Sequence, residues 1–171
     1  MTAPRRFALA PMQTWLRVLT LAVLAMPVVL FVAAWTSPRP VAQVLAAAAI
    51  FTVLVYASVW LVWRPTRFEV DDAELRIVWP LRSRRIPRAQ VEGVARVTGR
   101  EFRREHGWGM RIGAGGLGGG FGLLKTAGTT FSMWISRTDE FVVVRLRDAR
   151  PLLITPETPE RFVEALRPLA R

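Results

Sequence analysis

A glycine-rich stretch, residues 111–128, raises the question of nucleotide binding. It holds Gly113, Gly115 and Gly118 in the order G-x-G-x-x-G. In a dinucleotide-binding motif this order follows a strand, opens a helix whose N-terminus holds the phosphate, and precedes an acidic residue for the ribose. Here two more glycines follow and Phe121 begins an alternating strand pattern. We therefore predict a flexible connection between strands, able to lie on a membrane, and no phosphate site.

Side chains that could perform catalysis or bind metal are scarce. The chain has no cysteine and His106 is its only histidine, which excludes a thiol nucleophile and disfavours a zinc site. Lys125 and Thr126 follow Leu124, where a P-loop requires glycine. His106 lies in the polar stretch "REHGWG", so we expect a solvent-exposed side chain. A general base acting on a serine is the alternative, with these candidates: Ser83, Ser132 and Ser136. We predict no catalytic residue, no metal and no cofactor, and the sequence identifies no small-molecule substrate.

Arginines between residues 82 and 104 form the strongest functional signal in the second half of the chain. Eight arginines stand there against Glu92 and Glu101, for a net charge of +6. Near an anionic leaflet each basic side chain contributes about 1 kcal/mol, over roughly a Debye length. The alternative is a solvated strand face. The predicted contacts for anionic lipid or a partner are Arg82, Arg84, Arg85, Arg88, Arg103 and Arg104.

Nucleic acid is the other anion that a chain of net charge +11 could bind. Phe102 and Trp108 are the only aromatic residues near the arginines, and no recognition helix is predicted. We therefore expect no nucleic-acid partner. Lys125 is the only lysine, and the bias to arginine is also typical of GC-rich codon usage. Trp108, Phe121 and Trp134 form either an apolar patch for a peptide or, as we predict, ordinary core.

Two uncharged stretches precede this basic region and could position it at a membrane. Residues 18–34 and residues 41–63 contain 17 and 23 residues without a charge. Each can cross a bilayer core of about 30 Å as a helix. The connection "TSPRP" at residues 36–40 permits only an antiparallel hairpin, and Pro27 predicts a bend near Met26. The expected interfacial anchors are Trp15, Trp35, Trp60 and Trp63.

The flanking charges predict the orientation of this hairpin. Arg5 and Arg6 precede the first stretch and Arg64 and Arg67 follow the second, whereas the connection holds Arg39 alone. Basic residues favour the cytoplasmic side, so both termini are expected there. A cleaved signal peptide ending near "VAA" is the alternative, but a second apolar stretch follows within seven residues. The predicted division is a cytoplasmic tail (1–14), a transmembrane hairpin (15–63) and a soluble domain (64–171).

After residue 64 the pattern changes to short alternating runs separated by turn residues, which is typical of a β domain. A short helical turn can precede the fourth run. The last element is a helix with Thr158 as N-cap and Pro159 at its first position, ending near Arg167. The expected runs are 67–70, 75–79, 82–87, 91–98, 121–126, 129–136, 140–146 and 151–154. The predicted class is α+β: about seven strands forming a barrel or sandwich, closed by a C-terminal helix.

Three passages resemble the bacterial pleckstrin-homology-like (PH-like) membrane proteins. "FEVDDAELRIVWPLRSRRIPRAQVEGV" resembles the opening strands of that family, and "GGFGLLKTAGTTFSMWISRTDE" its middle strands. "VVVRLRDARPLLITPETPERFVEAL" resembles its last hairpin and helix, so the resemblance covers roughly residues 64–170. It implies a binding or scaffolding module on the cytoplasmic face of the inner membrane of a bacterium, crossed by both helices, without enzymatic chemistry. Eukaryotic relatives bind phosphoinositides with basic residues around the first hairpin, but here that turn, residues 71–74, is acidic.

These observations support two hypotheses of function. The first is a non-enzymatic membrane protein whose cytoplasmic PH-like domain binds the bilayer surface, a protein partner or a second copy of the chain. The second is an accessory subunit of a membrane transporter or enzyme complex, with the hairpin as the assembly element. The small residues at 46–49 would permit close helix contacts in that case.

Overall fold

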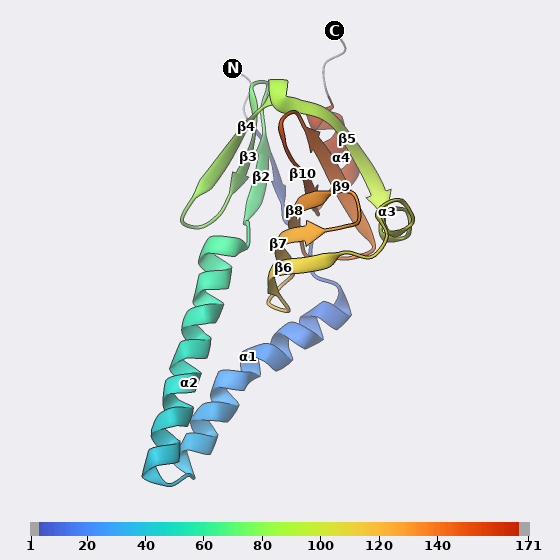
Figure 1. Ribbon diagram of the computed structural model, residues 1–171. Coiled ribbons are helices and arrows are strands. Elements are labelled where there is room, and N and C mark those ends of the chain that lie inside the picture. The colour runs from blue at the N-terminus through green and yellow to red at the C-terminus, as the bar shows by residue number, and fades with distance from the viewer. Residues whose placement is uncertain (1–3, 168–171) are drawn as a thin grey trace.

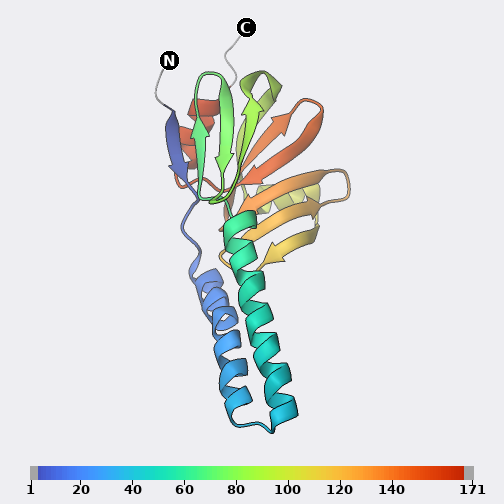
Figure 2. The same cartoon turned by 90° about the vertical axis from the view of Figure 1, so that its left-hand side faces the viewer.

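The computed structural model describes residues 4–167 and shows a helical hairpin attached to a β-rich domain. Figures 1 and 2 show the two long helices side by side below the domain. The outer ends of the predicted division, residues 1–3 and 168–171, lie outside the described residues.

Helices α1 (Thr14–Trp35) and α2 (Arg39–Ser58) form the hairpin, and α2 continues as a π-helical turn over Val59–Trp63. Both are long and apolar enough to cross a membrane, and only 11% of the most apolar window of each is buried. A core helix of a soluble domain would bury most of such a window, so these apolar side chains need another cover. α1 is unbroken at Pro27. The bend near Met26 stays a prediction.

The first sheet has four antiparallel strands in the order β1-β2-β3-β4. Their bounds are β1 Arg5–Ala8, β2 Arg67–Val70, β3 Glu74–Val78 and β4 Ser83–Pro87. β1 was not predicted, because residues 1–14 were assigned to a cytoplasmic tail. β1 pairs with β2, placing Phe7 opposite Phe68. The hairpin is therefore inserted between the first two strands of one sheet.

The second sheet has six strands in the order β5-β9-β10-β8-β7-β6. A 3-10 turn at Arg88–Gln90 precedes β5 (Val91–Thr98), which agrees with one of the two alternatives that the sequence allowed. β8 and β10 pair in parallel and the other neighbours are antiparallel. The remaining strands are β6 Met110–Gly115, β7 Gly120–Lys125, β8 Thr130–Ile135, β9 Glu140–Leu146 and β10 Ala149–Ile154. The two sheets stay open, so the sandwich alternative is confirmed and the closed barrel is wrong.

Two hydrophobic cores cover opposite faces of the second sheet. The first lies between the sheets and under α4 (Pro159–Leu166), whose Phe162 is fully buried. The second lies under α3 (Gly99–His106) and contains Phe102 and Phe131. Because neighbouring residues of a strand point to opposite faces, β8 serves both cores.

Three local predictions meet different outcomes. α4 begins at Pro159 and ends before Arg167, as predicted, although the Thr158 side chain makes no capping hydrogen bond. The first three residues of the polar stretch "REHGWG" end α3, a helix that was not predicted. The glycine-rich loop was predicted too long, because β6 occupies its first half and only residues 116–119 connect β6 to β7.

Candidate functional site

The β6–β7 turn, residues 116–119, joins the domain to the hairpin. Its backbone uses conformations that favour glycine, with φ of 86° at Gly116 and 75° at Gly118. The Thr20 hydroxyl of α1 donates to the Gly116 carbonyl at 3.0 Å or to its own helix at Leu16, and accepts from the Gly118 N–H at 3.0 Å. Thr20 is 4% exposed. The glycine motif therefore provides a docking turn, and no helix follows it to hold a phosphate.

Arg64 lies at the same junction, directly after α2. Its guanidinium stacks on Trp60, 4.5 Å from the ring centroid, and a Cβ on Gly118 would lie 3.3 Å from its Nε. That Nε is buried without a hydrogen-bond partner among residues 4–167. Burial lowers the pKa of Arg64. A bulkier residue at Gly118 would thus disturb both the turn and this cation.

The β3–β4 turn also meets the hairpin. The Trp79 indole N–H donates to the Trp63 carbonyl at 3.0 Å, which fixes the turn at the end of α2. Arg82 stacks on Trp79 at 4.7 Å, and Leu81 beside it is exposed. Two turns of the domain therefore lie at the end of the hairpin where α1 begins and α2 ends.

The structure separates the six predicted arginines. Arg82 and Arg84 lie at the hairpin end of β4, and both are exposed. Arg85 lies on the outer face of the first sheet, 3.8 Å from Glu74. Arg103 and Arg104 lie on α3, against the second sheet. The chain crosses from one sheet to the other between β4 and β5, so these arginines do not share one surface, and their role as contacts stays a prediction.

The guanidinium of Arg88 is hydrogen-bonded within the domain. It donates to the carbonyls of Asp71, Ala165 and Arg167, at 3.1, 2.8 and 2.8 Å. These bonds satisfy carbonyls at the C-terminal end of α4, where a cation also complements the helix dipole. Arg88 is therefore engaged within the fold and is not available as a free contact.

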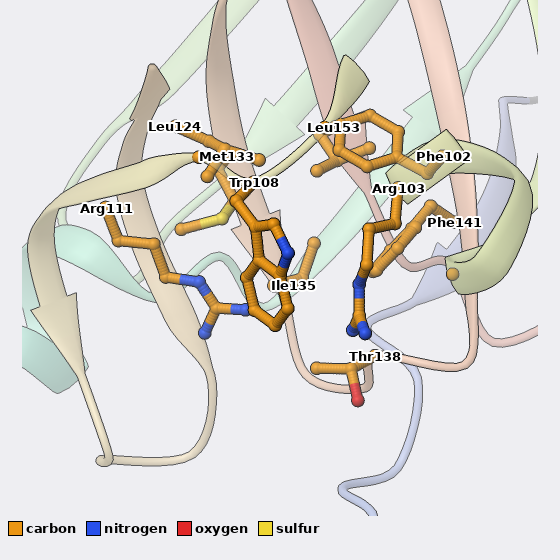
Figure 3. A pocket seen from close by; sticks show the side chains of 13 residues that line it. Phe102, Arg103, Trp108, Arg111, Leu124, Met133, Ile135, Thr138, Phe141 and Leu153 are labelled. Carbon is orange, nitrogen blue, oxygen red and sulfur yellow. The ribbon is translucent and has the colours of Figure 1, made fainter. Parts of the chain in front are cut away.

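A small pocket lies between α3 and the edge of the second sheet (Figure 3). Its lining includes Phe102 and Leu124 from the second core, with Arg103, Trp108 and Arg111 at its rim. Figure 3 shows Trp108 between the side chains of Arg103 and Arg111. The Arg103 guanidinium lies 4.6 Å from the centroid of the Trp108 ring. The rim combines two cations with an aromatic ring, an arrangement suited to an anionic group.

Of the three aromatic residues that the sequence offered as core or as an apolar patch, two are buried and one is exposed. Phe121 and Trp134 are buried in the first core, as predicted, whereas Trp108 is 82% exposed. Sequence reasoning did not place Arg111 in any site. Its neighbours Met110 and Ile112, together with Trp108, were the available signal, because they form an apolar run around a cation.

Residues 66–170 match the profile of the bacterial PH domain family. The chain belongs to that family. No curated protein sequence matches the chain. The matched part covers more than half of the chain and includes both sheets from β2 onwards, together with α4.

The first β-hairpin of this bacterial PH domain has an acidic turn that lies away from α1 and α2. β2 leaves the end of α2 at Arg67, so the turn at residues 71–74 lies at the far end of β2. The Asp71 carboxylate accepts the backbone N–H groups of Glu74 at 2.7 Å and Ala73 at 2.8 Å, and these bonds lower its pKa. A fixed negative charge there disfavours a lipid phosphate.

In this bacterial PH domain, His106 and Ser136 of the catalytic alternative make packing and hydrogen-bond contacts within the fold. His106 ends α3 and does not lie in a polar loop. Its ring centroid lies 5.0 Å from that of Phe131 and 4.7 Å from that of Phe102. The Ser136 hydroxyl donates to the Ala10 carbonyl at 2.5 Å. Among residues 4–167 no three His, Cys, Asp or Glu side chains could hold a metal ion.

The four predicted anchors lie at the two ends of the hairpin. Trp15 is in the first turn of α1, and Trp60 and Trp63 end α2, so three of them share the domain end. Trp35 lies at the opposite end of α1 and is 81% exposed. Their role at a membrane interface stays a prediction.

Proposed function

We propose that this chain is a non-enzymatic integral membrane protein whose bacterial PH domain serves as a binding or scaffolding module on the cytoplasmic face. The observation that carries the proposal is the pair of apolar, largely unburied helices fixed to the domain through Thr20 and the β6–β7 turn. Lipid is the medium that suits such a surface. The domain is then tethered, and its contacts set its orientation at the leaflet rather than its recruitment.

Two features favour retention of α1 in the mature protein over cleavage as a signal peptide. Cleavage after Ala34 would remove β1, which pairs with β2 over four residues. It would also remove Thr20 and so break the bonds to the β6–β7 turn. The distribution of arginine supports a cytoplasmic domain, because the connection at the far end of the hairpin holds Arg39 alone.

Lys125 provides a test of this placement, since it is the only lysine and it is exposed at the end of β7. An amine reagent that cannot cross membranes should label the peptide containing Lys125 in inverted vesicles and leave it unlabelled in intact cells. Lys125→Arg is the control for specificity of the labelled peptide. Labelling of Lys125 in intact cells, or recovery of the chain in the soluble fraction without detergent, would contradict the proposal.

Assembly through the hairpin is the second candidate function, and one observation favours it. α1 and α2 leave a wholly apolar cleft between them, far from the domain. Ala49 and Pro27 contribute to it, and a small residue permits close approach of a third helix. A photoreactive probe at Ile50, which lines the cleft, should then crosslink a membrane protein in native membranes. Recovery of no partner, together with a monomer in detergent, would exclude this role.

A further inference from the structure

The edge formed by α3 and β6 combines exposed apolar side chains with cations. We call Arg103, Trp108, Met110, Arg111 and Ile112 the α3–β6 edge. Trp108, Met110 and Ile112 are 82%, 61% and 49% exposed. β6 ends its sheet, since its only partner strand is β7. The three apolar side chains therefore lack a cover among residues 4–167.

The two arginines of this edge carry uncompensated charge. Neither has a carboxylate within 4.0 Å among the described residues, and both side chains are exposed. Two acids flank Arg103 in the sequence: Glu101 accepts hydrogen bonds from Thr98, and Glu105 lies 3.8 Å from His106 and 3.8 Å from Arg145. Arg111 shares the pocket face of the sheet with Leu124, its partner in the register. Both guanidinium groups are thus free to bind an external anion.

The position of the edge relative to the hairpin identifies the source of that anion. In Figures 1 and 2 β6 is the strand of its sheet nearest to the helices. The turn that follows β6 is bonded to Thr20 of α1. On the other side of the pocket, the Thr138 N–H and hydroxyl donate to Gln13 Oε1 at 3.3 and 3.0 Å, directly before α1 begins. The edge is therefore level with the start of α1, where the headgroups of a bilayer would lie.

We propose that the α3–β6 edge binds an anionic phospholipid of the bilayer that the hairpin crosses, in the leaflet next to the domain. Arg103 and Arg111 bind the phosphate, because a guanidinium offers paired donors to phosphate oxygens. Trp108, Met110 and Ile112 lie at the boundary between headgroups and acyl chains, which suits an indole ring. The inference rests on the proposed membrane placement. It goes beyond that placement by naming the lipid class and the residues that bind it.

The absence of cysteine allows a test with single labelled positions in the full chain. An environment-sensitive fluorophore is attached at Met110→Cys and, separately, at Phe51→Cys on the exposed surface of α2. Each protein is reconstituted in nanodiscs of phosphatidylcholine with increasing phosphatidylglycerol. We expect Phe51 to report an apolar environment in every disc. Met110 should report one only as phosphatidylglycerol is added.

The arginine variants then identify the binding residues. Arg103→Gln/Arg111→Gln should weaken the response to phosphatidylglycerol by roughly 30-fold, about fivefold for each arginine. The matched control, Arg85→Gln/Arg147→Gln, removes the same charge from arginines that pair with Glu74 and Glu92. It should leave the response within about twofold.

Each other outcome overturns a defined part of the account. If Phe51 reports lipid while Met110 stays in water, or if the response survives Arg103→Gln/Arg111→Gln, the lipid site is wrong and the membrane placement stands. Reversal of the response by inorganic phosphate at constant ionic strength would assign the site to free phosphate instead. A Met110 signal that changes only on addition of a protein partner would assign the edge to that partner. If Phe51 reports water, the proposed function fails, and the lipid site fails with it.

Discussion

The outer face of the first sheet and the α3–β6 edge both display arginines, but their surroundings differ. On the sheet, the nearly buried Glu69 lies 3.4 Å from Arg6, 2.7 Å from Arg67 and 3.9 Å from Arg76. Glu74 holds Arg76 at 2.6 Å and Arg85 at 3.8 Å. The edge has no such acids and adds exposed apolar side chains. Local pairing, more than the number of arginines in the sequence, distinguishes arginines that stabilise the fold from arginines available to a ligand.

The largest expected effect comes from a substitution on the outer face of the first sheet, which we call the paired face. Glu69→Gln should lower the free energy of unfolding by about 2–3 kcal/mol, because a neutral amide replaces the nearly buried carboxylate whose negative charge three guanidinium groups share. Arg111→Gln, on the unpaired edge, should change it by less than about 0.5 kcal/mol. Denaturant unfolding of the full chain in detergent measures both. Equal effects of the two substitutions would refute the distinction between the regions.

Arg88→Gln should give the next largest effect, about 1–2 kcal/mol of lost stability, since three carbonyls lose a charged donor. The same unfolding assay applies. Arg84→Gln is the matched control, because Arg84 is exposed on β4 and has no ion pair among residues 4–167. A stable Arg88→Gln protein with impaired lipid or partner binding would show that Arg88 belongs to the binding surface after all.

Thr98→Ala sharpens the comparison from the side of α3, the helix that presents Arg103. Thr98 and Glu101 form a capping box, in which the Thr98 hydroxyl accepts the Glu101 N–H at 3.2 Å. Its loss should cost about 1 kcal/mol. It should also weaken the response of the labelled α3–β6 edge to phosphatidylglycerol. An unchanged lipid response in a measurably destabilised protein would show that the position of α3 is irrelevant to binding.

The smallest expected effect is a pH dependence of the same cap. Hydrogen bonds from the Thr98 N–H and hydroxyl lower the pKa of Glu101 below its ordinary value of 4.5. The ionised form is therefore favoured by folding. Its contribution is complete above that value and is lost as the pH falls through the lower folded pKa. Glu101→Gln keeps a capping acceptor and should flatten this acid-side change in stability. An identical pH profile for the wild-type and variant proteins would contradict this assignment.

Much of the fold could be predicted, because the alternation of apolar and polar residues in strands and the length of the uncharged stretches are strong signals. Phe68, Val70, Leu75 and Ile77 mark the inner faces of β2 and β3, and all four are buried. β1 was missed because its four residues carry Arg5 and Arg6, which were interpreted as the flank of a membrane helix. Its partner strand lies some sixty residues later, and no local pattern contains that pairing.

α3 and β6 were missed for different physical reasons. α3 buries Phe102 alone, so it lacks an apolar stripe, although the spacing of Thr98 and Glu101 was a readable start signal. β6 contains glycines and is exposed on an edge, so its strand character depends on pairing with β7. Because both elements were missed, Arg103 was grouped with distant arginines, and Arg111 was overlooked.

The depth of two spin labels in nanodiscs containing phosphatidylglycerol tests the central claim most directly. One label replaces Ile112 on the α3–β6 edge, and the other replaces Arg85 on the paired face. The account predicts that the Ile112 label lies at the boundary between headgroups and acyl chains, more accessible to oxygen than to a water-soluble relaxation agent, while the Arg85 label lies in water. Equal exposure of both labels to the water-soluble agent would contradict it.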